Sequence, residues 1–171
     1  MTEHTEPPGA MRELAEPLAA FVEEVALFFE SGGMPRIAGR IVGYLLVCDP
    51  PHRSVTELAQ ELDVSKGSVS TMTRMLRNTG LLEQAPVPGE RARYMRLRND
   101  GFEAVFEHQV RQVSAFAELA SKGLTLLESD AHERSLRLRT LAALYGFYER
   151  EMPRLLQRWR EERVRLVEDV S

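Results

Sequence analysis

The sequence predicts a mainly α-helical protein with one small β-hairpin. Over most of the 171 residues, apolar side chains recur three or four positions apart, which is the spacing of amphipathic helices. Between residues 81 and 98 this period is lost, and two short runs with strand character flank the turn-forming segment 86–91. Such a pattern is typical of a hairpin.

Composition and charge indicate a soluble, globular class of protein. The chain has 43% hydrophobic residues and a net charge of −4, which suits one or at most two soluble globular domains. Its longest apolar run, residues 41–48, is far shorter than the roughly 20 residues of a membrane span. The acidic, proline-bearing start lacks the pattern of a secretory signal. We therefore expect a cytoplasmic protein with no membrane partner.

The first two helices are marked by the residues that begin and end them. Pro17 suits a helix start, and Gly32-Gly33 ends the first helix. A second helix is predicted from Arg36 to Val47, before Asp49-Pro50-Pro51. The apolar stripe of the first helix consists of Leu18, Phe21, Val22, Val25, Phe28 and Phe29.

Two shorter helices follow. Ser54, with Glu57 three residues later, has the pattern of a capping box for a third helix over residues 55–62. A tight bend is expected at Asp63-Val64. Ser65 then caps a fourth helix, which runs to about Asn78 and ends at Gly80.

The only strands expected are residues 81–85 and 92–98. After them, Asn99 is predicted to cap a long helix that reaches residues 122–123. Ser129 or Asp130 is predicted to begin another helix. Pro153 should break or kink that helix, because proline removes a backbone donor.

Two short helices joined by a tight turn and followed at once by a hairpin form the winged helix-turn-helix arrangement. One face of the fourth helix is apolar, with Val69, Met72, Thr73 and Leu76. The opposite face carries Gly67, Ser70, Thr71, Arg74 and Asn78. A helix in the DNA major groove needs such a face, because arginine binds guanine, threonine contacts the thymine methyl and asparagine pairs with adenine.

Further DNA contacts are expected on either side of that face. The N-terminus of the fourth helix attracts phosphate, and arginines at the hairpin tip can reach the minor groove or the backbone. The predicted DNA-binding residues are Ser65, Lys66, Ser68, Ser70, Thr71, Arg74, Asn78, Arg91 and Arg93. The alternative is a winged helix that binds another protein and whose arginines are merely solvated.

The charge is unevenly distributed along the chain. Residues 1–30 carry seven acids against one base, whereas residues 36–98 carry ten bases against six acids. Residues 99–171 are nearly balanced, with thirteen acids and eleven bases. The overall acidity therefore hides a basic central segment, which suits contact with the phosphates of double-stranded DNA.

Four segments together resemble the GbsR branch of the MarR-type transcriptional regulators. They are GMPRIAGRIVGYLL at 33–46, DPP at 49–51, SKGSVS at 65–70 with Thr73-Arg74, and PGER at 88–91 with Tyr94 and Arg96-Leu97. The resemblance covers about residues 20 to 101. It implies a homodimeric bacterial repressor or activator, with dimer helices at both ends of the chain and a small molecule that modulates DNA binding.

The residues themselves also favour a dimer. The first helix and the helices after residue 99 carry more large apolar side chains than a lid on a small domain needs. Two-fold symmetry would place two such domains on an inverted-repeat operator; a monomer with a helical cap is the alternative. The predicted regions are a frayed tail (1–13), an N-terminal dimerisation helix (14–32), a winged helix-turn-helix domain (34–98) and a C-terminal helical dimerisation region (99–171).

Other sites receive weaker support from the sequence. Aromatic residues could line an effector pocket or belong to the core or interface: Phe28, Tyr44, Phe116, Tyr145, Tyr148 and Trp159. Cys48 is the only cysteine, which excludes an internal disulfide; it is either a redox sensor or an inert buried thiol. The four histidines have no metal-ligand spacing, and no phosphate loop or nucleophile elbow is present. No enzyme activity, metal or cofactor is expected.

Overall fold

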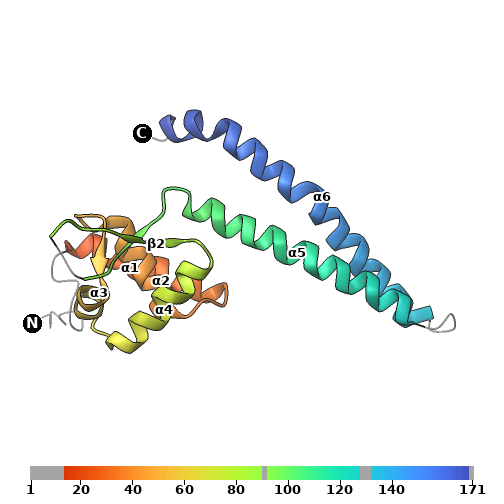
Figure 1. The fold of residues 1–171 in the computed structure, drawn as a ribbon, viewed down its shortest axis with the longest axis horizontal. Helices are drawn as coiled ribbons and strands as arrows, with labels where there is room; N and C mark the ends of the chain where they lie inside the picture. Colours follow the sequence, from red (N-terminus) through yellow and green to blue (C-terminus); the bar gives the residue numbers. More distant parts are fainter. Residues whose placement is uncertain (1–13, 90–91, 128–131, 170–171) are drawn as a thin grey trace, which may run out of the picture. The chain divides into compact units, whose positions relative to one another are not determined.

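The structure, a computed structural model, describes residues 14–89, 92–127 and 132–169. The chain divides after Phe102 into two compact units (Figure 1). The first unit contains α1 (Glu16–Ser31), α2 (Arg36–Val47), β1 (Arg53–Ser54), α3 (Val55–Glu61), α4 (Lys66–Asn78), β2 (Leu82–Ala85) and β3 (Tyr94–Leu97). The second is built from α5 (Gly101–Leu126), which begins at the boundary, and α6 (His132–Glu168).

The predicted starts of the two short helices are confirmed by their caps. Ser54 Oγ accepts from the Glu57 N–H at 3.2 Å, and the Ser54 N–H donates to Glu57 Oε2 at 2.6 Å, so the capping box is complete. Ser65 caps α4 by accepting from the Ser68 N–H at 3.1 Å. These local bonds satisfy donors that a helix start leaves unpaired.

Three helices of the first unit end in the same motif. A residue with positive φ follows α1, α3 and α4: Gly33 (87°), Asp63 (49°) and Gly80 (82°). In each case the next backbone N–H donates to a carbonyl five residues earlier at 3.0 Å, as in Val64 to Ala59. This is the Schellman arrangement. It confirms the predicted end at Gly80 and the bend at Asp63-Val64, where an aspartate occupies the left-handed position.

The sheet contains one strand more than the sequence predicts. Its three antiparallel strands lie in the order β1-β3-β2. The hairpin of β2 and β3 is confirmed, with Glu83 opposite Arg96. The expectation that the hairpin is the only β structure is wrong, because Arg53 and Ser54 pair with Met95 and Tyr94. Two residues are too few for an alternating pattern to reveal a strand.

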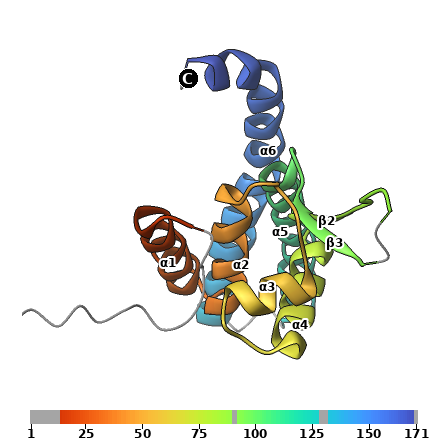
Figure 2. The same ribbon diagram turned by 90° about the vertical axis from the view of Figure 1, so that its left-hand side faces the viewer.

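The core of the first unit forms around α2, which contacts α1, α4 and β3. Figure 2 shows α2 between α1 and the α3–α4 pair. The largest fully buried side chains come from every helix of the unit: Tyr44, Ile41, Leu58, Leu62, Leu76, Leu81, Val22, Val42 and Val69. The helix-turn-helix is therefore fixed to α2 by continuous apolar packing.

Two glycines of α2 let α1 approach unusually closely. A Cβ atom built on Gly39 would lie 2.8 Å from the Ala26 Cα, and one on Gly43 would lie 3.1 Å from the Val22 Cα. Both α1 residues are fully buried. The glycines of the predicted second helix therefore serve this helix crossing, since any side chain there would push α1 away.

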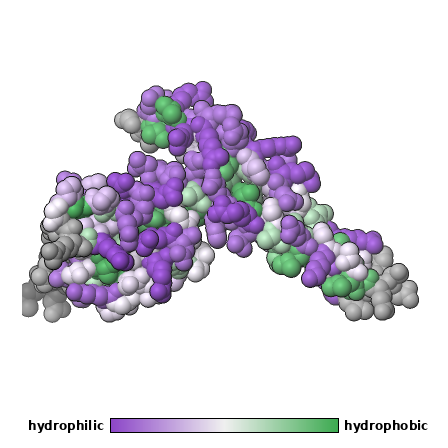
Figure 3. Space-filling view, in the orientation of Figure 1, coloured by the Kyte–Doolittle hydropathy of each residue, from purple (hydrophilic) through white to green (hydrophobic). Residues whose placement is uncertain are grey.

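In the second unit, α5 and α6 run antiparallel. Phe116 packs on Tyr145 with ring centroids 4.6 Å apart, and Glu103 pairs with Arg160. Among the hydrophobic side chains of the described residues after Phe102, only Ala120 and Leu156 are buried. Two helices alone thus cover little of their own apolar surface, and Figure 3 shows hydrophobic side chains at the surface of this helix pair.

Three predictions for these helices need correction or lie outside the description. α5 begins at Gly101, two residues after Asn99, and extends to Leu126. A turn precedes it, in which the Gly101 N–H donates to the Arg98 carbonyl at 3.0 Å. The predicted helix start at 129 or 130 lies outside the described residues. α6 continues through Pro153, so the predicted break does not occur, and a kink there stays a prediction. Both Pro153 and Glu149 are exposed, so water can compensate the carbonyl that loses its donor. Within the described ranges, no helix is long and apolar enough to cross a membrane.

Candidate nucleic-acid interface

The N-terminus of α4 combines two serines with a lysine. The hydroxyl oxygens of Ser65 and Ser68 lie 2.9 Å apart, and Ser65 caps the helix. The side chain of Lys66 is exposed, and the first turn of this fully described helix contains no acidic residue. The positive end of the helix dipole therefore lies beside a cation, and the first turn adds no negative charge, an environment that favours phosphate.

α4 buries one face and presents the other to solvent. Val69, Thr73 and Leu76 are buried, and the Thr73 hydroxyl is satisfied by donating to the Val69 carbonyl at 2.8 Å. The predicted contact residues of the opposite face are all exposed: Ser70, Thr71, Arg74 and Asn78. Their side chains need no rearrangement of the core to reach a ligand.

The hairpin places a second group of side chains beside the helix-turn-helix. The segment that joins β2 to β3 contains Gly89 with φ of 84°. Arg93 is exposed just before β3 begins. Arg91, the other predicted contact residue of the wing, lies outside the described residues. Arg93 is therefore the described arginine of the predicted wing contacts that is available to solvent.

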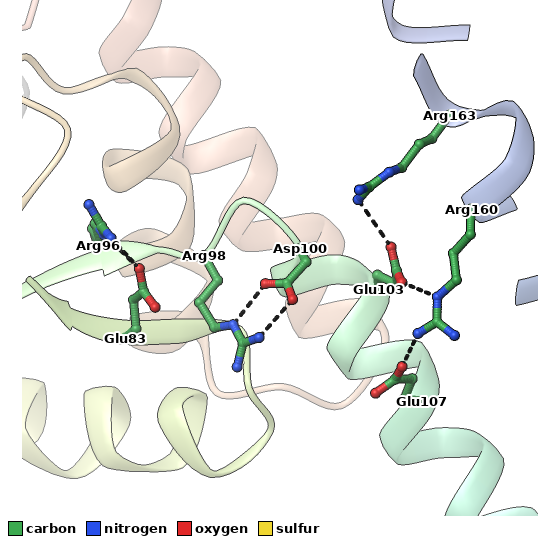
Figure 4. Close-up of polar contacts among 8 residues, drawn as sticks. All are labelled: Glu83, Arg96, Arg98, Asp100, Glu103, Glu107, Arg160 and Arg163. Atoms are coloured by element: carbon green, nitrogen blue, oxygen red, sulfur yellow. Dashed lines mark hydrogen bonds and ion pairs between the residues drawn. The ribbon is translucent and has the colours of Figure 1, made fainter. Parts of the chain in front are cut away.

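Two cations that the sequence assigns to the basic segment are compensated locally (Figure 4). Arg96 Nε donates to Glu83 Oε1 at 2.6 Å across the hairpin. Arg98 forms a bidentate pair with Asp100, with Nε–Oδ1 of 2.8 Å and Nη2–Oδ2 of 2.7 Å. Neither guanidinium is an obvious phosphate ligand, because each already has a carboxylate partner.

Other cations are left without such a partner. Over the described residues, no salt bridge joins an acid to Lys66, Arg74, Arg77 or Arg93, and all four are exposed. Arg77 is absent from the residues predicted to bind DNA. Its position one helical turn from Arg74 could have indicated it. Within the described residues of the first unit, the positive charge without a salt bridge is therefore concentrated on α4 and just before β3.

Three further arginines of the basic segment have structural partners. Arg36 and Arg40 of α2 both donate to Glu23 of α1, at 3.0 and 2.7 Å. The bond to Glu23 raises the pKa of Arg36. Arg53 is buried, and its guanidinium donates to the carbonyls of Pro50, His52 and Asp49 at 2.7 to 3.0 Å. A charge count along the sequence cannot separate these arginines from solvent-facing ones.

The aromatic residues predicted to line an effector pocket do not form one group. Phe116 and Tyr145 line a cavity of about 540 Å³ within the second unit, whereas Trp159 is not part of its lining. Tyr44 is fully buried in the first unit, and Phe28 is 73% exposed on α1. The lining residues of the cavity are Gln109, Gln112, Val113, Phe116, Tyr145, Tyr148 and Met152.

The single cysteine lies at the end of α2. Cys48 is the C-cap residue of that helix and is buried. Its thiol donates to the Pro50 carbonyl at 3.4 Å. A buried thiol with a local acceptor is the environment of a structural cysteine more than of a reactive one.

Comparisons with known proteins give consistent results. Residues 100–162 match the family model of the MmpR5-like MarR family transcriptional regulators, and residues 36–86 match the IclR helix-turn-helix domain. The HTH-type transcriptional regulator MmpR5 of Mycobacterium tuberculosis (strain ATCC 25618 / H37Rv) is 40% identical over 146 residues, which cover 85% of this chain and 88% of MmpR5.

Solved structures show the same likeness. The crystal structure of a transcriptional regulator is 38% identical with a TM-score of 0.76, and the match covers 85% of this chain and 99% of that one. Sco3205, a MarR family transcriptional regulator from Streptomyces coelicolor solved in complex with DNA, is 19% identical with a TM-score of 0.40, covering 71% and 86%. The latter likeness is too distant to bear on function.

Proposed function

The chain belongs to the MmpR5-like MarR family of transcriptional regulators, and from that premise we propose that it is a homodimeric, sequence-specific DNA-binding repressor. The observation that carries the proposal is the exposed face of α4, which is polar, contains no acid and has a lysine at its N-terminus. Such a helix fits the width of the major groove and offers side chains that distinguish bases.

In this proposal the predicted residues have distinct roles. Arg74, Thr71 and Asn78 read base edges, and Ser70 contacts a base or a phosphate. Ser65, Lys66 and Ser68 hold the phosphate backbone at the end of α4. The wing arginines, Arg91 and Arg93, contact the adjacent minor groove or backbone. Arg77 adds a further phosphate contact.

A pair of alanine variants tests this placement. Arg74→Ala should weaken binding to a selected operator by about 1–3 kcal/mol and relax the base preference at one position. Lys66→Ala should weaken binding to all sequences and reduce the slope of log K against log salt concentration by about one. Electrophoretic mobility or anisotropy titrations over a range of salt concentrations measure both effects.

The matched control is Arg137→Ala, which removes the same charge from an exposed position of α6. It should change neither base preference nor salt slope. If Arg74→Ala and Lys66→Ala bind DNA as the wild type does, α4 is not the interface.

The second copy in the proposed dimer covers apolar surface that the monomer leaves exposed. On α1, Phe21 is 41% exposed and Phe28 is 73% exposed, although both belong to the same apolar stripe as buried Val22. The α5–α6 pair exposes many more large apolar side chains. Monomeric soluble proteins rarely expose large apolar patches. A two-fold dimer would then bind an inverted-repeat operator with half-sites about one helical turn apart.

A small-molecule effector completes the proposal. The cavity lined by Phe116 and Tyr145 has a volume in the range of small-molecule sites, about 540 Å³. A ligand there would lower DNA affinity by favouring a different separation of the two DNA-binding units. Val113→Trp should obstruct the cavity and weaken the response to an effector without changing operator affinity in its absence.

A finer placement within the family rests on motifs of the first unit. The PRIAGRIVGYLL block and the PGER segment support membership of the GbsR branch. For such a DNA-binding role we also propose a location in the cytoplasm of a bacterial cell. Footprinting on the DNA upstream of its own gene, with candidate effectors added, would test the operator and the effector together.

A further inference from the structure

Arg40 of α2 makes two hydrogen bonds that join elements far apart in the sequence. Its Nε donates to Glu23 Oε1 of α1 at 2.7 Å, and its Nη1 donates to the carbonyl of Leu62 at 2.8 Å. The side chain is only 17% exposed. A guanidinium that uses two of its N–H groups inside the protein is poorly placed to bind a phosphate.

The Leu62 carbonyl belongs to the turn of the helix-turn-helix. Leu62 is the C-cap residue of α3, and Asp63 follows it with φ of 49°. The carbonyl groups at a helix end lack partners within the helix. The conformation of this turn sets the direction in which α4 leaves α3. The bond from Arg40 therefore holds the turn from outside the motif.

The Arg40 side chain is also firmly attached to α1, through Glu23. Glu23 accepts from Arg36 as well as from Arg40, and α1 packs closely on the glycines at positions 39 and 43. One connected set of contacts thus runs from α1 through Arg40 to the turn before α4. Charge-assisted bonds of this kind are stronger than neutral ones and restrict geometry.

We propose that Arg40 is a positioning residue for DNA recognition: it fixes α4 relative to α1, so that the placement of α1 in the dimer determines how α4 meets the groove. The inference rests on the proposed function, because it assumes that α4 reads DNA and that α1 contacts the second copy. It assigns a role to the second arginine of the PRIAGR segment that neither charge nor base contact explains.

The test compares the same substitution at two neighbouring arginines. Arg40→Met removes both bonds, whereas Arg36→Met removes a bond to Glu23 and leaves the Leu62 carbonyl in contact. The probes are a duplex that the wild type selects from a random-sequence library and a scrambled duplex of equal length. For Arg40→Met we expect the ratio of the two affinities to fall about tenfold, with an unchanged salt slope. Arg36→Met should keep the ratio.

Arg40→Lys distinguishes the effect of positioning from the effect of charge. It also provides a second variant if Arg40→Met misfolds, which circular dichroism would detect. A single ammonium group keeps the charge but cannot reproduce the planar fork that reaches two acceptors. If Arg40 acts by positioning α4, Arg40→Lys should lose selectivity as Arg40→Met does.

Wild-type selectivity in Arg40→Lys, equal ratios in the two methionine variants, or a salt slope reduced by about one in Arg40→Met would each overturn the inference. A wild type that enriches no sequence would overturn the proposed function as well, so the two failures are distinguishable.

Discussion

At the scale of single residues, the centre of the first unit contains a buried cation. Arg53 is 6% exposed, and its guanidinium lies 5.7 Å from the centroid of the Tyr44 ring. Its bonds to three carbonyls hold the segment between α2 and β1 against the sheet. Arg53, although it is counted among the bases of residues 36–98, therefore stabilises the fold and does not contact DNA.

The environment of Tyr44 predicts a loss of stability at alkaline pH. Burial raises the pKa of Tyr44 from 10.0 to about 12, against the opposing effect of Arg53. The unfolded chain therefore releases this proton at lower pH than the folded chain does. The free energy of unfolding should be independent of this group below pH 10.0 and should fall as pH rises through the window up to about 12.

Urea denaturation at successive pH values across that window would measure the slope. Tyr44→Phe removes the titrating hydroxyl and should flatten the slope relative to the wild type. If the variant and the wild type lose stability in parallel, Tyr44 does not titrate in this way.

At the scale of elements, the α1–α2 crossing depends on the absence of side chains at two positions. Gly39→Ala would bring a Cβ atom to 2.8 Å from the Ala26 Cα and 3.1 Å from the Ala26 carbonyl oxygen. Both neighbours are backbone atoms, which cannot rotate away. We expect the free energy of unfolding to fall by about 1–3 kcal/mol, as overpacked cores do.

The matched control is Gly67→Ala, also within a helix. The nearest atom to a Cβ on Gly67 is Ser65 Oγ at 3.8 Å. Because alanine has a higher helix propensity than glycine, Gly67→Ala should raise the free energy of unfolding by up to about 1 kcal/mol. Chemical denaturation of both variants checks the contrast, and equal effects of the two substitutions would contradict a close α1–α2 crossing.

At the scale of the whole molecule, two surfaces of opposite character stand out. Among the described residues of the first unit, the exposed cations without a salt bridge lie on α4 and just before β3, whereas exposed apolar side chains lie on α1 and, in the second unit, along α5 and α6. A DNA-binding dimer needs this division, because phosphates attract the first surface and a second copy covers the other.

A charge placed on the apolar surface of α1 tests the dimer. Because Phe28 is 73% exposed, Phe28→Glu should leave the fold intact and raise the dissociation constant of the dimer about tenfold or more, as truncation of an aromatic anchor does. Sedimentation equilibrium measures the change. Ala20→Glu adds the same charge at an exposed position of α1 outside the apolar stripe and should have little effect.

Two outcomes would remove this part of the proposal. The first is a wild type that sediments as a monomer. The second is an equal loss of association in Phe28→Glu and Ala20→Glu, which would indicate a general charge effect and not a specific interface.

The sequence by itself determined the helices of the first unit, their caps, the hairpin and the exposed face of α4. These features depend on interactions within a few residues: Ser54 with Glu57, Ser65 with Ser68, and the 3.6-residue period that separates Thr73 from Arg74. Interactions of this kind can be predicted from the sequence alone, because both partners are neighbours along the chain.

Only the tertiary structure decided which charges face solvent. Arg96 meets Glu83 because of strand register, Arg40 meets Glu23 because α1 crosses α2 at two glycines, and β1 exists only because β3 lies beside it. These contacts join residues at least 13 positions apart, and their formation depends on packing that no local pattern encodes. The basic segment predicted from charge counts is therefore a smaller, more defined surface in the folded chain.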